Sequence, residues 1–154
     1  MTNPAWYPDS LNKDLIAEFI LWFSRIEYAL KSDPAFSKAL PYFQADWDKL
    51  KLALSSAPVP QKLGQALACI QNQPPMKQSG ANKWDKIQGS DDWDLLIRAL
   101  KTVRNNLFHG GKHYTGPVLQ PVRDQELLNH CLAVMKEIST LLPQHLQITF
   151  AEAA

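Results

Sequence analysis

The chain has 154 residues, of which 45% are hydrophobic and 20% charged, and its 16 basic and 15 acidic side chains leave a formal net charge of +1. These values are typical of one globular domain and exclude a disordered or collagen-like chain. The two cysteines, Cys69 and Cys131, lie far apart and lack a His or Cys partner at ligand spacing, which argues against a disulfide framework and against a structural zinc site.

The predicted elements are helices, because leucine and alanine outnumber the β-branched residues. The first helix is expected from about Ser10 to Lys31, with Asp9 or Ser10 as its N-cap. Its apolar side chains recur at steps of three and four, which places them on one face; they are Leu11, Leu15, Phe19, Trp22, Ile26 and Leu30. A second helical region is expected over residues 34–54.

Prolines at residues 58 and 60 end this region, and a short helix is expected at about residues 61–71. The polar segment from Gln73 to Ser90 contains two prolines and two glycines. We interpret it as a long loop, with Trp84 as its anchor to the body of the protein.

The next helix is expected from about Asp91 to Phe108 or His109, with Ser90 as its N-cap and a buried stripe made of Leu96, Leu100, Val103 and Leu107. From Leu95 to Arg123 the chain has five basic residues and no acidic one; they are Arg98, Lys101, Arg104, Lys112 and Arg123. The remaining residues include 11 basic and 15 acidic side chains. The near-neutral total therefore conceals a basic segment that is suited to a polyanionic partner.

Gly110 and Gly111 are expected to end that helix, and a last long helix is predicted from about Arg123 to Leu142. Its expected core residues are Leu128, Cys131, Met135, Ile138 and Leu142. The tail after residue 143 is interpreted as peripheral. Together these elements predict one all-α domain over residues 1–154, a helical bundle with four principal helices plus short extra helices. The last two long helices are expected to form an antiparallel hairpin.

No signal peptide is visible, and the apolar run from Phe19 to Phe23 is too short to span a bilayer. We therefore expect a cytoplasmic protein without a membrane partner, in which both cysteines are reduced.

Side chains suited to phosphodiester chemistry gather at the end of the helix over residues 91–109. Arg104 offers a bidentate contact to a phosphate. His109 lies beside the free carbonyls of the helix end, whose partial negative charge favours the imidazolium, so it can donate or accept a proton near neutral pH. Asn105 lies four residues before His109, where it can orient the ring. On RNA the 2′-OH is the nucleophile, so this set requires no metal and no cofactor.

Two other considerations bear on this pair. The same residues also fit a surface helix with a solvated basic face, whose histidine only satisfies the helix dipole. In addition, Arg104 and His109 differ by about 140° around an ideal helix, so they converge poorly on one atom of one chain. A second copy, related by a two-fold axis, would bring the missing partner into a composite site.

The segment Arg104-Asn105-x-x-x-His109, which closes a predicted helix and is followed by glycine, resembles the Arg-x(4–6)-His motif of HEPN domains. The asparagine directly after the arginine resembles the ribonuclease members of that family. Residues 23–31, Phe-Ser-Arg-Ile-Glu-Tyr-Ala-Leu-Lys, are similar to the first helix of several small prokaryotic HEPN families. The order of motif helix, glycine-bearing loop and long closing helix matches as well.

The resemblance implies a HEPN-like homodimer in which two motifs face one cleft and cleave RNA without a metal, as a toxin or phage-defence effector. Arg104 would bind and polarise the scissile phosphate, and His109 would serve as general acid or base. The supporting residues would be Asn105, Asn106 and Glu27, the last of which lies at the edge of the apolar face of the first helix. The expected RNA contacts are Lys101, Lys112, His113 and Tyr114.

The resemblance also implies an antitoxin or nucleotidyltransferase as a further partner. The antitoxin-paired branch of the family carries a modified tyrosine two residues after the motif histidine, but here Gly111 has that place and Tyr114 lies five residues after His109. Two alternatives remain open. One is a catalytically silent HEPN domain that binds nucleotide or RNA or serves as a dimerisation module, and the other is a structural helical interaction protein. The intact Arg104, Asn105 and His109 favour the enzyme.

Overall fold

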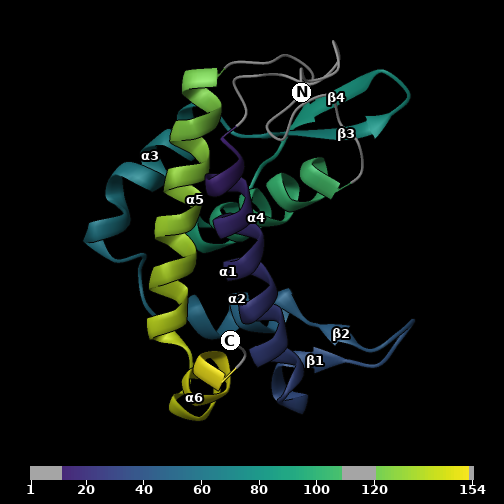
Figure 1. Ribbon diagram of the computed structural model, residues 1–154, viewed down its shortest axis with the longest axis vertical. Helices are drawn as coiled ribbons and strands as arrows, with labels where there is room; N and C mark the ends of the chain where they lie inside the picture. The colour runs from purple at the N-terminus through teal and green to yellow at the C-terminus, as the bar shows by residue number, and fades with distance from the viewer. Residues whose placement is uncertain (1–11, 109–120, 153–154) are drawn as a thin grey trace, which may run out of the picture.

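Six α-helices and two small antiparallel hairpins form the part of the chain that the computed structural model describes, residues 12–108 and 121–152 (Figure 1). The helices are α1 (Lys13–Lys31), α2 (Trp47–Leu54), α3 (Gly64–Asn72), α4 (Asp92–Phe108), α5 (Pro121–Leu141) and α6 (Gln144–Glu152). The strands are β1 (Ser37–Lys38), β2 (Gln44–Ala45), β3 (Met76–Gly80) and β4 (Lys83–Lys86). Helices account for 69% of the described residues, so the prediction of an all-α domain is confirmed as far as a mainly α-helical fold, to which the two hairpins are added.

The core lies where α1, α4 and α5 meet. α5 packs along α1 in the most extensive contact between two helices, and α4 runs across this pair (Figure 1). Large side chains with almost no exposed surface fill the space between them; they include Phe19, Ile26, Leu30, Leu96, Leu100, Leu128, Met135 and Ile138. The antiparallel hairpin expected from α4 and α5 is therefore wrong, because α5 takes α1 as its main partner. An apolar stripe determines which face of a helix is buried, but not which helix covers it.

The helix ends follow ordinary capping chemistry, one or a few residues away from the predicted caps. The cap of α1 is Asn12, whose Oδ1 accepts the Leu15 N–H at 3.1 Å. At the start of α4, Asp91 Oδ1 accepts the Asp94 N–H at 2.8 Å, so Asp91 rather than Ser90 caps this helix. Helix α3 and the buried residues of α5 agree with their predictions.

The tail after residue 143 is part of the fold, contrary to our expectation that it is peripheral. It forms α6, whose Leu146 is fully buried in contact with the core. His145 Nε2 lies 2.7 Å from Asp33 Oδ2, and the rings of Trp22 and Phe150 lie 5.2 Å apart. These contacts attach α6 to α1 and to the turn that follows it.

The second predicted helix is largely replaced by a hairpin. Ser37 pairs with Ala45 and Lys38 with Gln44, and only residues 47–54 are α-helical. Pro41 explains the difference, because a proline lacks the amide donor that a helix needs and disfavours the helical conformation of the residue before it.

A second hairpin lies inside the segment that we interpreted as a loop. Strands β3 and β4 pair Lys77 with Asp85 and Gln78 with Trp84, and the turn contains Asn82 with φ 57°. Asparagine tolerates this left-handed conformation better than most residues. Both hairpins extend on the same side of the helices, with the C-terminal half of α4 between them (Figure 1).

Replacing Leu146 with alanine should lower the free energy of unfolding by about 2–5 kcal/mol, because it removes a fully buried side chain and leaves a cavity. Urea titration followed by circular dichroism measures the change. The matched control is Ile148→Ala in the same helix. Its side chain is 55% exposed, so we expect a change of less than about 0.5 kcal/mol. Equal effects of the two variants would contradict the burial of α6.

Candidate functional site

The candidate site lies on the outward face of α4. Leu100 and Val103 of this helix are fully buried, so Lys101, Arg104 and Asn105 lie away from the core on neighbouring turns. Two hollows flank this face, one on the side of each hairpin. Lys101 and Asn105 line both of them and form the ridge between the two.

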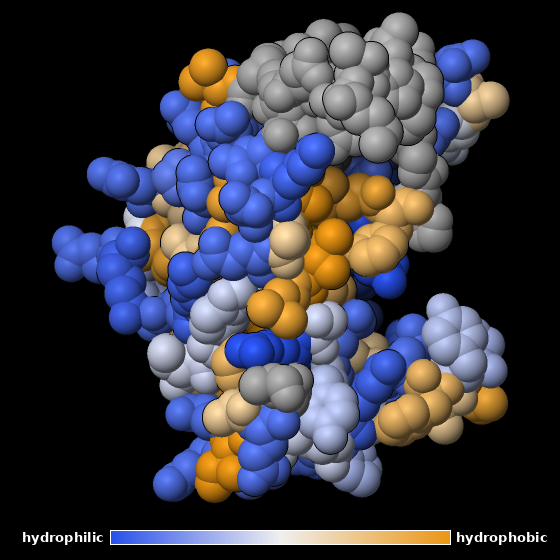
Figure 2. Space-filling view, viewed as in Figure 1, coloured by the Kyte–Doolittle hydropathy of each residue, from blue (hydrophilic) through white to orange (hydrophobic). Residues whose placement is uncertain are grey.

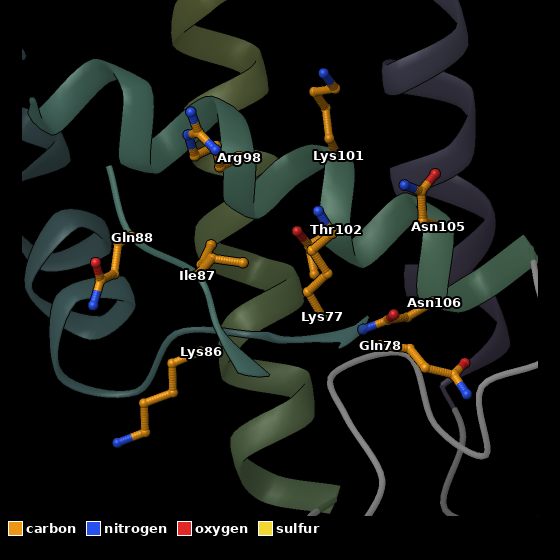
Figure 3. Close-up of a pocket in the computed structure, with 10 residues that line it drawn as sticks. All are labelled: Lys77, Gln78, Lys86, Ile87, Gln88, Arg98, Lys101, Thr102, Asn105 and Asn106. Carbon is orange, nitrogen blue, oxygen red and sulfur yellow. The ribbon is translucent and has the colours of Figure 1, made fainter. Parts of the chain in front are cut away.

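The first hollow, here named the hairpin groove, lies between α4 and the β3–β4 hairpin and has a volume of about 660 Å³ (Figure 3). It is lined by Lys77, Gln78, Lys86, Ile87, Gln88, Arg98, Lys101, Thr102, Asn105 and Asn106. Four of these side chains are cationic and none is acidic. In Figure 3, Lys77 reaches toward Thr102 of α4, whereas Lys86 and Lys101 extend away from each other on opposite sides of the groove.

After β4 the backbone passes close to the first turns of α4, and Gly89 makes this close approach possible. A Cβ on Gly89 would lie 2.5 Å from the backbone nitrogen of Leu95. A larger residue would therefore push this segment away from the first turns of α4. The approach helps to close the groove at the end where Gln88 and Arg98 lie.

The second hollow, here named the aromatic hollow, has a volume of about 430 Å³ and lies between α1, the β1–β2 hairpin, the start of α2 and α4. Its lining combines aromatic rings with charges of both signs. The aromatic residues are Phe23, Tyr42, Phe43 and Trp47; the charged residues are Glu27, Lys31, Lys38, Asp46, Asp48, Lys101 and Arg104. Gln44, Ala45 and Asn105 complete it.

Aromatic rings hold the Arg104 guanidinium. Its Cζ atom lies 4.9 Å from the centre of the Phe108 ring and 6.0 Å from that of Phe23, and its Nη1 donates to Asn105 Oδ1 at 3.1 Å. Among the described residues no carboxylate forms an ion pair with Arg104. A cation–π contact orients a guanidinium without neutralising it, so the charge remains available to an anion.

Glu27, which we named as a supporting residue, lines the same hollow as Arg104. The contact recorded for the Glu27 carboxylate is nevertheless with α2, where its Oε2 accepts the Trp47 indole N–H at 3.3 Å. No ion pair joins it to Arg104 within the described ranges.

Asn106 has a structural contact. Its side chain is buried and its Nδ2 donates to the Met76 carbonyl at 3.0 Å, which ties α4 to the start of β3. Asn105, its exposed neighbour, lines both hollows, whereas Asn106 lines only the hairpin groove. The two amides that we grouped as supporting residues therefore have different environments.

Asp94 orders the end of the hairpin groove at which Arg98 lies. Burial of this carboxylate would by itself raise its pKa. The hydrogen bond from the Ser90 N–H at 2.9 Å, the hydrogen bond and charge of Arg98 at 2.8 Å and the charge of Lys51 at 3.5 Å outweigh that effect and lower the pKa of Asp94 to about 2. Part of the Arg98 charge is therefore engaged within the protein.

The basic segment divides into residues with different contacts. Arg123 donates to Gln73 Oε1 at 3.1 Å and to the carbonyls of Gln73 and Pro74, so it anchors the start of α5 rather than facing a groove. Lys101 and Arg104 remain at the candidate site. His109, Lys112, His113 and Tyr114 lie outside the described residues.

Sequence reasoning missed the residues that the hairpins contribute, namely Lys77, Lys86, Lys38, Tyr42 and Phe43. Each hairpin nevertheless has one feature in its sequence that could have indicated it. An Asn turn flanked by lysines at residues 77–86 is typical of a polar hairpin, and Tyr42-Phe43 directly after a proline is an unusual pair for a solvated segment.

Two further properties of the described ranges bear on the site. No three His, Cys, Asp or Glu side chains there lie close enough together to hold a metal ion. None of the helices there is long and apolar enough to span a bilayer. Comparison of the chain with protein-family models, with curated proteins and with solved structures finds no match.

Replacing Asp94 with asparagine should change how stability depends on pH. The folded-state pKa lies below the ordinary value of 3.8, so the carboxylate stabilises the fold above that value and this contribution is lost as the pH falls toward 2. We expect Asp94→Asn to lose about 2 kcal/mol at pH 7 and to approach the wild type near pH 2.

Urea titrations from pH 2 to pH 7 test this expectation. The control is Asp92→Asn, which removes a carboxylate from the same turn but none of the contacts of Ser90, Arg98 and Lys51. An Asp94→Asn profile that runs parallel to the wild-type profile over the whole range would show that the low pKa is wrong.

Proposed function

We propose that this protein is a HEPN-like, metal-independent endoribonuclease that acts as a homodimer. The observation that carries the proposal is the position of Arg104 and Asn105 on one face of α4. Asn105 lines a basic groove without acidic side chains, and Arg104 lines the aromatic hollow beside it. The phosphate backbone of a nucleic acid is the polyanion that such a groove suits.

The chemistry assigns one role to each motif residue. A base removes the proton of the 2′-OH, the 2′-oxygen attacks the adjacent phosphorus, and the bond to the 5′-oxygen breaks as that oxygen receives a proton. Arg104 stabilises the charge that develops on the phosphate oxygens, because its guanidinium is not ion-paired with a described carboxylate. His109, which follows the last residue of α4 in the sequence, serves as the acid or base.

The homodimer forms part of the proposal because residues five positions apart on an ideal helix, such as Arg104 and His109, would point about 140° apart. A two-fold axis near the end of α4 would bring Arg104 of one copy toward His109 of the other. The proposal also includes a role as a toxin or phage-defence effector with an antitoxin or nucleotidyltransferase as partner. This part follows from the resemblance to HEPN domains.

A catalytically silent RNA-binding domain is the second candidate. The hairpin groove favours it independently of the motif, since Lys77 and Lys86 lie on the hairpin and have no part in the chemistry assigned to Arg104 and His109. The two candidates share the binding surface and differ in whether the bound RNA is cut.

RNA cleavage in the presence of EDTA tests the enzyme. We expect the wild type to cut a mixed-sequence RNA and both Arg104→Ala and His109→Ala to lose at least about a hundredfold in rate. Arg104→Lys keeps the charge but not the fork geometry, so it should recover only part of the activity. Binding without cleavage by the wild type would favour the silent domain, and cleavage unaffected by both alanine variants would refute the assignment.

Mixing the two inactive variants tests the composite site. If Arg104 and His109 act across the dimer, equilibrated mixtures of Arg104→Ala and His109→Ala should regain about a quarter of the wild-type activity through mixed dimers. If both residues act within one chain, each chain of a mixed dimer still lacks one of them, and the mixture stays as inactive as the separate variants.

Salt dependence tests the groove. Lys77→Ala and Lys86→Ala should each weaken RNA binding by about three- to tenfold and reduce the slope of log affinity against log salt, because each removes a cation from the groove. The control is Lys83→Ala, in the same hairpin but outside the groove lining. Fluorescence anisotropy measures the affinities, and an equal loss in all three variants would show only a general charge effect.

A further inference from the structure

The aromatic hollow presents two rings to solvent beside the motif. Tyr42 is 66% exposed and Phe43 is 60% exposed, although both line the hollow, whereas Phe23 and Trp47 are buried there. Figure 2 shows the β1–β2 hairpin projecting from the body, with a notch between them and hydrophobic surface near its tip. Adjacent exposed rings beside a hollow are a common feature of surfaces that bind an apolar or aromatic partner.

The cations around these rings are not neutralised by described carboxylates. Lys31, Lys38 and Lys101 form no ion pair within the described ranges, and neither does Arg104. Four cationic and three acidic side chains therefore line a hollow with exposed aromatic rings, and none of the four cations forms an ion pair within the described ranges.

Two of the three acidic side chains in the hollow are occupied by contacts within the protein. Asp46 Oδ1 accepts the N–H groups of Asp48 and Lys49 at the start of α2, at 3.1 and 3.2 Å. Glu27 accepts from the Trp47 indole. These contacts satisfy part of the acceptor capacity of the two carboxylates but do not remove their charge. With Asp48 included, the four cations exceed the three carboxylates of the hollow by one charge.

The combination of cations and exposed aromatic rings distinguishes a nucleic-acid partner from a protein partner. The centre of a protein–protein interface is depleted in lysine, whereas surfaces that bind single-stranded nucleic acid combine cations for the backbone with aromatic rings on which bases stack. A duplex keeps its bases stacked inside, so it cannot offer one to Tyr42 or Phe43.

From this we infer that the substrate is single-stranded RNA, one unpaired base of which stacks on Tyr42 or Phe43 while the neighbouring phosphate lies at Arg104 and Lys101. The inference rests on the proposed function and names its substrate class. Because Lys101 and Asn105 line both hollows, the strand continues over this ridge into the hairpin groove. Tyr42 and Phe43 are then specificity-determining residues, and no part of the bond-breaking step depends on them.

Anisotropy with labelled RNA of one length, single-stranded or in a duplex, tests the inference. We expect the wild type to favour the single strand by at least about tenfold, and the double variant Tyr42→Ala/Phe43→Ala to lose about ten- to a hundredfold of that affinity. Its weak duplex binding should not change. The control is Leu52→Ala, which removes a side chain that is 70% exposed on α2, outside the hollow.

An abasic scan separates stacking from charge. Removing one base at a time keeps every phosphate, so one abasic position should weaken wild-type binding about tenfold and should not weaken binding by the double variant further. Circular dichroism of the double variant should match the wild type, because both rings are largely exposed.

The outcomes distinguish the inference from the function on which it rests. If the wild type neither binds nor cuts any RNA, both fail. If it cuts RNA in EDTA but is indifferent to the abasic positions and to Tyr42 and Phe43, only the stacking inference fails. A double variant that changes the oligomeric mass in solution and leaves RNA affinity intact would overturn the inference in favour of a protein contact.

Discussion

The buried stripe of α4 is the constraint on which the candidate site depends. Leu96, Leu100 and Val103 are fully buried where this helix packs against α2, α3 and α5. Their burial fixes the rotation of the helix about its own axis, and a rotation that exposed them would cost several kcal/mol. The same rotation turns Lys101 and its neighbours Arg104 and Asn105 toward the two hairpins. The positions of the polar side chains are therefore consequences of the packing of apolar ones.

The sequence predicted the helices because their buried residues recur with a helical period. It did not predict the hairpins because their burial leaves no periodic pattern. The core residues of α5 recur at steps of three and four. Strands β3 and β4 are exposed along almost their whole length, so no alternation of apolar and polar residues marks them. The same reasoning explains the error at α6, where one fully buried residue, Leu146, is too little to define a period. Of the residues that line the two hollows, sequence reasoning named Lys101, Arg104, Asn105 and Asn106 of α4 and Glu27 of α1, but none from the two hairpins.

The uneven charge along the chain located the helix of the site but not the surface of the site. Of the basic residues in the segment, Arg98 pairs with Asp94, and Arg123 caps backbone carbonyls before β3. In the groove, Lys77 and Lys86 of the hairpin add their charges to those of Lys101 and of Arg98, which is partly engaged by Asp94. A count of charges along the sequence treats all cations as equal. In the folded chain, a cation that forms an ion pair or binds a backbone carbonyl contributes to the fold and is less available to a ligand. Only the structure distinguishes the cations that stabilise the fold from those that line the groove.

The adjacent amides of α4 show how closely the motif and the fold depend on each other. Asn105 lies exposed on the ridge between the two hollows, while the next residue, Asn106, is buried and holds the β3 backbone through Met76. Because successive residues of a helix point about 100° apart, one face of α4 contributes to the site and the neighbouring face anchors the hairpin that completes it. A shift of the hairpin would move Lys77 relative to Lys101, so this buried contact helps to set the width of the groove, together with the close approach of Gly89 to α4. The segment that resembles a catalytic motif thus also positions the surface that would present RNA to it.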